Sequence, residues 1–255
     1  MKIIEEKKTI RDIPTILCKS DDNRKKPLVI VSHGFTQSKE TYAANDCLKD
    51  LAELGYYAVA IDNRLHGDRP GQDFHTAVMN SSGEIDLLAL RMAMKETADD
   101  VKLLIDEVSM LEEVEDERIA MLGVSMGGFV TYRTIVTDHR IKVAIPIISS
   151  PFWDDIPGDV KIDKAPDLEA NLRALIKEYQ PSNHMDQFYP AALLIQVGDS
   201  DKHYDISKLK SFYQKLKGYY HASPDKVQLI IYSDTKHEFR REMWEQALIW
   251  LKDYL

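Results

Sequence analysis

Short apolar runs alternate with longer amphipathic stretches along most of the chain. Near-continuous aliphatic runs bounded by charged residues or glycine are typical of strands that a parallel sheet buries on both faces. The pattern predicts an antiparallel opening pair of strands and then a series of buried ones. These strands are expected over residues 2–10, 13–18, 27–32, 56–62, 118–122, 142–149, 191–198 and 227–232.

Between most of these strands, apolar residues recur at the spacing of one helix face. Helices are predicted over residues 38–55, 85–111, 129–136, 168–178, 206–216 and 238–255. Strand–helix–strand order favours right-handed parallel crossovers. We therefore expect an α/β fold, in which a mostly parallel sheet of about eight strands lies between helices. At 255 residues the chain is expected to form one domain over residues 1–255.

Residues 151–188 depart from this alternation because they are polar and rich in proline at their start. They follow the sixth predicted strand and are too few to bury a core of their own. We expect them to form a small insertion that leaves the sheet.

Charge and cysteine content exclude some classes of function. The chain has 33 Lys and Arg against 42 Asp and Glu, a net charge of -9, which argues against a nucleic-acid partner. No basic and apolar leader opens it, and no apolar run approaches the ~20 residues needed to span a bilayer. Cys18 and Cys47 suggest neither a disulfide framework nor a metal site. We expect a cytoplasmic protein with no membrane partner.

One motif carries candidate chemistry: Gly123-Val-Ser125-Met-Gly127, a G-x-S-x-G pattern between a predicted strand and a predicted helix. In that context the serine occupies a strained, exposed turn, and glycines let the strand and helix backbones approach. The alternative is a Gly-Ser loop that only makes a turn.

A serine hydroxyl needs a base within hydrogen-bond reach and a group that orients the base. His237 follows the last predicted strand and is the expected base; the alternative is a surface histidine that caps the last helix. Asp199, Asp201 and Asp205 follow the preceding strand, and Asp201 is favoured over Asp199 by its depth in the loop. His203, next to this acid, is expected to be a bystander.

An oxyanion intermediate needs backbone donors, for which the amides of Met126 and Phe35 are the candidates. His33 is expected to be a scaffold residue, and residues 62–67 a buried polar turn beneath the site. The histidines form no H-x-x-x-H pair or compact His/Asp cluster, so no metal and no cofactor are expected.

Several segments together resemble the α/β-hydrolase superfamily, in order and spacing over essentially the whole chain. Within it, the chain is similar to small bacterial serine esterases related to dienelactone hydrolase and to the catalytic domain of prolyl oligopeptidases. The matching segments are His33-Gly34-Phe35-Thr36, residues 62–67, residues 123–128, residues 198–201 and His237.

The resemblance implies Ser125 as nucleophile, Asp201 as acid and His237 as base. It also implies that residues 151–188 form a cap over the site. Dienelactone hydrolases proper use a cysteine nucleophile, so their substrate is not carried over. If residues 151–188 form a cap, the candidate substrate-binding side chains are Phe152, Trp153 and Ile156, with Phe35 and Tyr42 from the opposite side. The alternative is that these aromatic residues only seat the insertion on the core.

The resulting hypothesis is a carboxylesterase that cleaves small-molecule esters of small to medium acyl chains through an acyl-enzyme, with a homodimer as the candidate assembly. Two alternatives remain open. One is a peptidase or amidase that uses the same three residues, and the other is a non-catalytic binding protein of the same fold.

Overall fold

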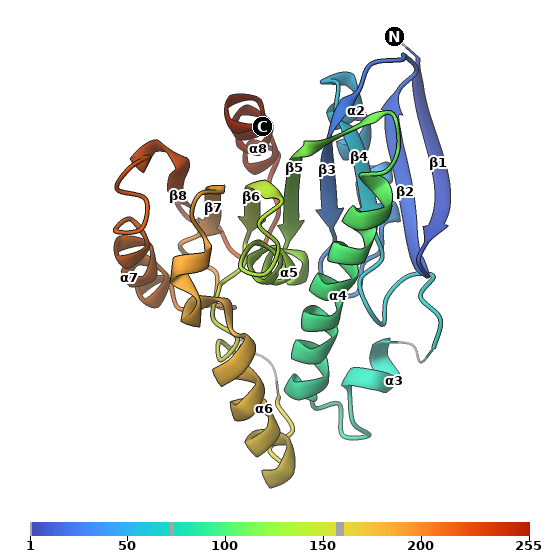
Figure 1. Cartoon of the computed structure of the whole chain (residues 1–255). Helices are drawn as coiled ribbons and strands as arrows, with labels where there is room; N and C mark the ends of the chain where they lie inside the picture. The colour runs from blue at the N-terminus through green and yellow to red at the C-terminus, as the bar shows by residue number, and fades with distance from the viewer. Residues whose placement is uncertain (1, 72–73, 157–160) are drawn as a thin grey trace.

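A computed structural model describes residues 2–71, 74–156 and 161–255. Within them, eight strands form one sheet in the order β1-β2-β4-β3-β5-β6-β7-β8. Strands β3 to β8 are parallel, and the β1–β2 hairpin joins the edge antiparallel to β4 (Figure 1). The expected α/β fold is confirmed. The strands are β1 (Ile3–Ile10), β2 (Ile13–Ser20), β3 (Lys26–Ser32), β4 (Tyr57–Ile61), β5 (Val114–Val124), β6 (Ile141–Ile147), β7 (Ala192–Gly198) and β8 (Val227–Tyr232).

The helices agree with the sequence pattern except between residues 38 and 84. The single helix expected over 38–55 is two short helices, because Asp46 has a φ of 58° and a right-handed helix cannot continue through a left-handed residue. A short helix, α3, also lies between residues 63 and 84, where no helix is predicted. The helices are α1 (Glu40–Ala44), α2 (Cys47–Glu53), α3 (Phe74–Val78), α4 (Leu87–Val108), α5 (Met126–Ile135), α6 (Pro166–Tyr179), α7 (Ile206–Leu216) and α8 (Arg241–Tyr254).

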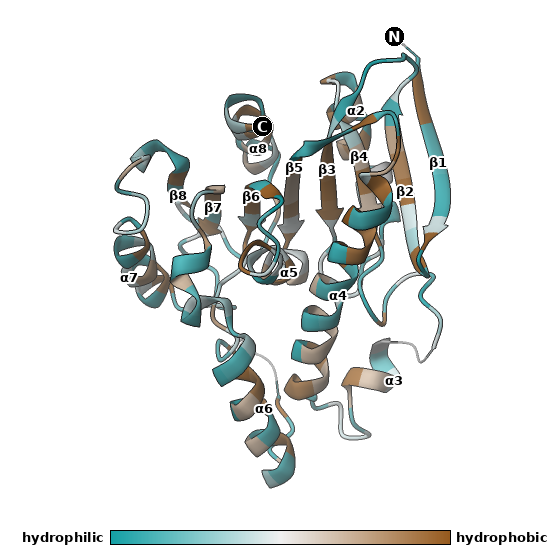
Figure 2. Cartoon of the chain, viewed as in Figure 1, coloured by the Kyte–Doolittle hydropathy of each residue, from teal (hydrophilic) through white to brown (hydrophobic). Residues whose placement is uncertain are grey.

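Helices cover both faces of the sheet, and alternate strand residues face each layer. In β3, Leu28 and Ile30 belong to the apolar layer that also contains residues of α4, α5 and α7. Val29 and Val31 belong to the opposite layer, which contains residues of α2 and α8. The inner strands β3, β4 and β7 are therefore buried along their whole length, whereas the edge strand β1 is mostly polar and exposed (Figure 2). Strand β5 is buried continuously only from Ile119 onward, after an exposed charged stretch over residues 116–118. Burial on both faces explains why the central strands could be predicted from aliphatic runs.

Of residues 151–188, the described parts 151–156 and 161–188 follow β6 and lie at the edge where the parallel strands end. Residues 157–160 of the predicted insertion lie outside the described residues. Their helix α6 and the first half of α4 extend beyond this edge (Figure 1). Ile85, just before α4, forms a parallel bridge with Ile162. The segment is thus tied to the start of α4 on the side where the β3, β5, β7 and β8 loops lie.

Two further observations bear on the expectations from composition. Across residues 2–71, 74–156 and 161–255, no helix combines the length and the apolar character that a membrane span needs. Cys18 and Cys47 are both buried and have free thiols.

A buried polar network holds the loops that follow β3 and β4. The Asn63 backbone N–H donates to His33 Nε2 at 3.0 Å, and Asn63 Nδ2 donates to the His33 carbonyl at 2.8 Å. Ser32 Oγ donates to Asn63 Oδ1 at 2.7 Å. Asp62 is fully buried and accepts from the N–H and the ammonium group of Lys39. The buried polar turn expected over residues 62–67 is therefore present, with His33 attached to it.

His33 must be neutral in this network, because its Nε2 accepts a backbone N–H and so has no proton. Burial lowers the pKa of His33 from 6.5 to about 4. The unfolded chain binds a proton below about pH 6.5 and the folded protein only near pH 4, so the free energy of unfolding falls as the pH falls through this window.

We predict that His33 accounts for about 1 kcal/mol of the stability lost between pH 7 and pH 5.5. The His33→Gln variant, although less stable at pH 7, should lose that much less than the wild type over the interval. Urea unfolding at the two pH values measures this difference. The same change at the exposed His139 is the control, and an unaltered pH dependence in His33→Gln would contradict the assignment.

Candidate active site

Ser125 sits in the tight turn between β5 and α5. Its φ of 54° and ψ of -116° place a residue with a side chain in a strained conformation. A Cβ on Gly123 would lie 2.1 Å from the Gly127 carbonyl oxygen, and one on Gly127 would lie 1.9 Å from the Ser32 oxygen. Only glycine fits at these two positions, so the strand–turn–helix interpretation of the motif agrees with the geometry.

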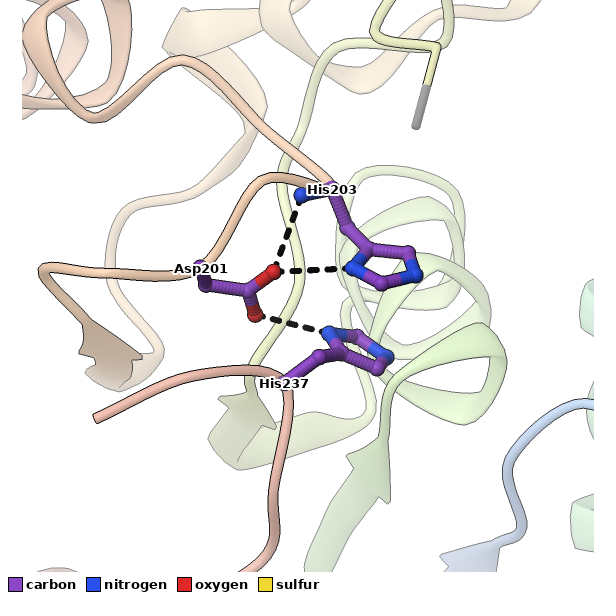
Figure 3. Close-up of side chains that lie close together, drawn as sticks. All are labelled: Asp201, His203 and His237. Atoms are coloured by element: carbon purple, nitrogen blue, oxygen red, sulfur yellow. Dashed lines mark hydrogen bonds and ion pairs between the residues drawn. The ribbon is translucent and has the colours of Figure 1, made fainter. Parts of the chain in front are cut away.

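His237 and Asp201 approach Ser125 from the loops after β8 and β7. The two loops are in close contact at Gly198, where an added Cβ would lie only 2.1 Å from the Thr235 carbonyl oxygen. Ser125 Oγ lies 2.7 Å from His237 Nε2. On the other side of the ring, His237 Nδ1 lies 2.7 Å from Asp201 Oδ2 (Figure 3). Three side chains separated by up to 112 positions in the sequence thus form one hydrogen-bonded chain.

The Asp201 carboxylate fixes how the His237 ring is protonated. Burial raises the pKa of Asp201, but hydrogen bonds from His203 and His237 outweigh it and hold the pKa well below its usual range. The ionised carboxylate only accepts, so Nδ1 of His237 carries the proton. Nε2 is then the acceptor that faces the Ser125 hydroxyl.

The other two acidic candidates of this loop lie elsewhere. Asp199 is exposed and accepts a hydrogen bond from Ser200 Oγ at 3.0 Å. Asp205 is the N-cap of α7, where its side chain accepts from the N–H groups of Ser207 and Lys208. Of the three aspartates, the geometry singles out Asp201.

His203, expected to be a bystander, lies inside the site. Its Nδ1 is 2.9 Å from Asp201 Oδ1, and its ring stacks on that of His237 with centroids 3.7 Å apart. Figure 3 shows the carboxylate of Asp201 beside the two stacked rings, with one oxygen facing Nδ1 of each ring. The sequence feature that could have indicated this contact is the position of His203 two residues after Asp201. At that spacing the Asp201 carboxylate can accept from both rings.

This arrangement corrects the expectation that the histidines form no compact His/Asp cluster. Candidate ligand atoms of Asp201, His203 and His237 lie within 4.8 Å of one another and could hold a metal ion. In the geometry described, each carboxylate oxygen accepts from one ring, and His237 Nε2 faces Ser125. A metal at His237 would therefore compete with the serine hydroxyl.

The candidate oxyanion donors lie beside the serine. A Cβ on Gly34 would lie 3.6 Å from Ser125 Cβ, so the loop after β3 reaches Ser125. Phe35 and Met126 both line the cavity that holds Ser125. Met126 begins α5, where the first N–H groups have no partner within the helix. His66 Nε2 accepts from the Thr36 N–H at 3.2 Å and so braces this loop.

A cavity of about 390 Å³ opens onto Ser125 and His237. One side is the loop after β3, and the other is the face formed by α4 and α5. Most of its lining is apolar, including several α4 side chains that the sequence analysis did not assign to the site. The residues of α4 and α5 that line the cavity are Leu87, Leu90, Arg91, Met94, Met126 and Phe129.

Four of the five side chains expected to bind substrate lie outside this lining. Tyr42 is buried in the layer of α2, where its hydroxyl donates to the Ser32 carbonyl. Trp153 is fully buried, and Phe152 packs edge-on against Phe212. Ile156 is 48% exposed on a separate groove beside α6. The expectation is corrected for these four, since aromatic or apolar character does not fix the direction of a side chain.

Comparison with known proteins gives a consistent result. The family model described as serine aminopeptidase, S33 matches residues 23–188. YitV of Bacillus subtilis (strain 168), which is named as an esterase, is 27% identical over 276 residues that cover 98% of each chain.

Two solved structures share the fold. TT1662 from Thermus thermophilus has a TM-score of 0.78 at 18% identity and covers 99% of this chain and 98% of its own. An acetyl xylan esterase from Paenibacillus sp. R4 has a TM-score of 0.73 at 20% identity, covering 95% and 80%. With the family match spanning more than half of its length, the chain belongs to the serine aminopeptidase S33 family of α/β-hydrolases.

Proposed function

We propose that the protein is a carboxylesterase that cleaves esters of small to medium acyl chains through an acyl-enzyme on Ser125. The hydrogen-bonded chain from Ser125 through His237 to Asp201, open to an apolar cavity, carries this proposal. A hydroxyl 2.7 Å from an unprotonated imidazole nitrogen is positioned to lose its proton during attack on a carbonyl.

The reaction then follows from the same atoms. His237 Nε2 takes the serine proton, and Asp201 stabilises the imidazolium that forms. The amides of Phe35 and Met126 are the proposed donors to the oxyanion. His237 returns the proton to the leaving alkoxide and then activates water, which releases the acid and restores the serine.

The alternative enzyme is a peptidase or amidase with the same three residues, as the description of the family suggests. An aminopeptidase must bind the positively charged amino terminus of its substrate. The described lining of the cavity instead includes the cation Arg91, and the carboxylate of its one acidic side chain, Asp155, accepts from Ser150 and Lys208. This charge distribution favours esters over peptides with a free amino terminus.

Substrate class is tested with p-nitrophenyl esters from acetate to octanoate beside aminoacyl-anilides. We expect faster specific turnover of the esters, with an optimum among the shorter chains because the cavity is small. In Ser125→Ala, kcat should fall by about 10³-fold or more. Faster turnover of the anilides would favour the peptidase, and hydrolysis of neither class would favour a binding protein.

The choice of acid is tested by comparing Asp201→Asn with Asp199→Asn. The first substitution removes the negative charge that holds the proton on His237 Nδ1, so kcat should fall about 10²- to 10⁴-fold. The second changes an exposed side chain and should leave kcat within about twofold of the wild type. Equal effects of the two substitutions would reject the assignment of Asp201.

A further inference from the structure

Arg91 is a cation buried in the wall of the candidate active site. It lies on α4, is only 3% exposed, and lines the same cavity as Ser125 and His237. Its neighbours on that helix face, Leu90 and Met94, are apolar. An arginine placed among apolar residues and out of water carries a large desolvation cost unless an anion or several acceptors compensate.

The described residues satisfy the hydrogen-bond donors of the Arg91 guanidinium only in part. Its Nε donates to the Trp153 carbonyl at 2.9 Å, and its Nη2 donates to the Asp155 carbonyl at 2.8 Å. Nη1 contacts the sulfur of Met94 at 3.3 Å, and the guanidinium lies 4.8 Å from the centroid of the Phe129 ring. A guanidinium has five N–H donors, so one on each terminal nitrogen has no acceptor among the described residues.

No described carboxylate forms an ion pair with Arg91. Asp155 lines the same cavity, but its Oδ2 accepts from Ser150 at 2.7 Å and its Oδ1 from Lys208 at 3.1 Å. Lys208 also pairs with Asp154. Burial lowers the pKa of Arg91 to about 10 against the weaker attraction of Asp155 and Asp154, so the guanidinium is still charged at neutral pH. The nearby acids are thus engaged by Lys208 while Arg91 keeps its charge.

We propose that Arg91 forms a subsite for a substrate carboxylate, so that the preferred esters are monoesters of dicarboxylic acids. This inference rests on the proposed esterase function. Two N–H groups of one guanidinium match the two oxygens of a carboxylate. The carboxylate belongs to the acyl arm, because that arm stays on Ser125 through both steps whereas the alcohol must leave.

Phe129 sets the spacing between the two ends of the site. Its backbone N–H donates to the Ser125 carbonyl, so it lies one helical turn from the nucleophile, and the guanidinium of Arg91 stacks on its ring. An acyl arm that runs along this ring has an apolar middle and a charged end. Hemi-esters of succinate, glutarate and adipate cover the range of lengths to test.

The experiment compares each p-nitrophenyl hemi-ester with its methyl-capped form, which has nearly the same shape and no charge. In the wild type, kcat/KM should be at least tenfold higher for the charged form of the best length. Arg91→Gln should lower this ratio by tenfold or more, and Arg91→Lys should lower it less because it keeps the charge. The control Leu90→Met, in the same wall, should change both forms in parallel.

Because each ratio compares two substrates on one protein, a partly unfolded variant does not alter it. A wild type that hydrolyses the capped esters with no preference for the charged ones would overturn the subsite and leave the esterase proposal standing. If Arg91→Gln lowers kcat/KM equally for the charged and the capped esters, Arg91 only ties residues 153–155 to α4. That result also overturns the subsite.

A binding measurement separates the subsite from catalysis. Calorimetry with 5-oxohexanoate, a non-hydrolysable ketone with one carboxylate, should show binding to the wild type and at least tenfold weaker binding to folded Arg91→Gln. Binding of equal strength to both would overturn the subsite even if no ester is hydrolysed.

Discussion

The close approach of the first turn of α5 to the end of β3 is the constraint on which the site depends. The backbone at Gly127 lies so near the Ser32 carbonyl that no side chain fits between them. The start of α5 therefore lies against the neighbouring strand β3. Ser125 must adopt a positive φ to connect β5 to a helix that begins there. The same contact brings the loop after β3 beside the serine. Ser125, the proposed nucleophile, and both candidate oxyanion donors are therefore positioned by backbone packing.

The second constraint is electrostatic and centres on Asp201. Its side chain is fully buried, yet it accepts hydrogen bonds from two imidazoles, which keep it ionised. The stacked rings of His203 and His237 limit each other's rotation. His237, the proposed base, is thus held from two sides before any substrate binds, a preorganisation that suits the proposed acyl transfer. Below this layer, neutral His33 and His66 hold the β3 loop by accepting backbone N–H groups.

Sequence patterns predicted the parts of the molecule that backbone geometry dictates. Aliphatic runs identified the buried strands, and glycines flanking Ser125 identified the turn, because few other residues satisfy those positions. His237 and Asp201 followed from the rule that parallel strands end at one edge. Patterns failed where the outcome depends on which way a side chain points. Tyr42 and Trp153 are aromatic but buried away from the cavity. His203 was expected to be a bystander, yet its ring stacks on that of His237. Arg91 could have been noticed, since it lies four residues after Leu87 and three before Met94 on the apolar face of α4.

The central claim is that the hydroxyl on this turn becomes covalently modified during the reaction. Mass spectrometry of peptides from protein treated with a fluorophosphonate tests it most directly. The account predicts one adduct, on Ser125, formed much more slowly when His237 is replaced by alanine. An adduct on a different serine, or ester hydrolysis that continues while Ser125 stays unmodified, would contradict it.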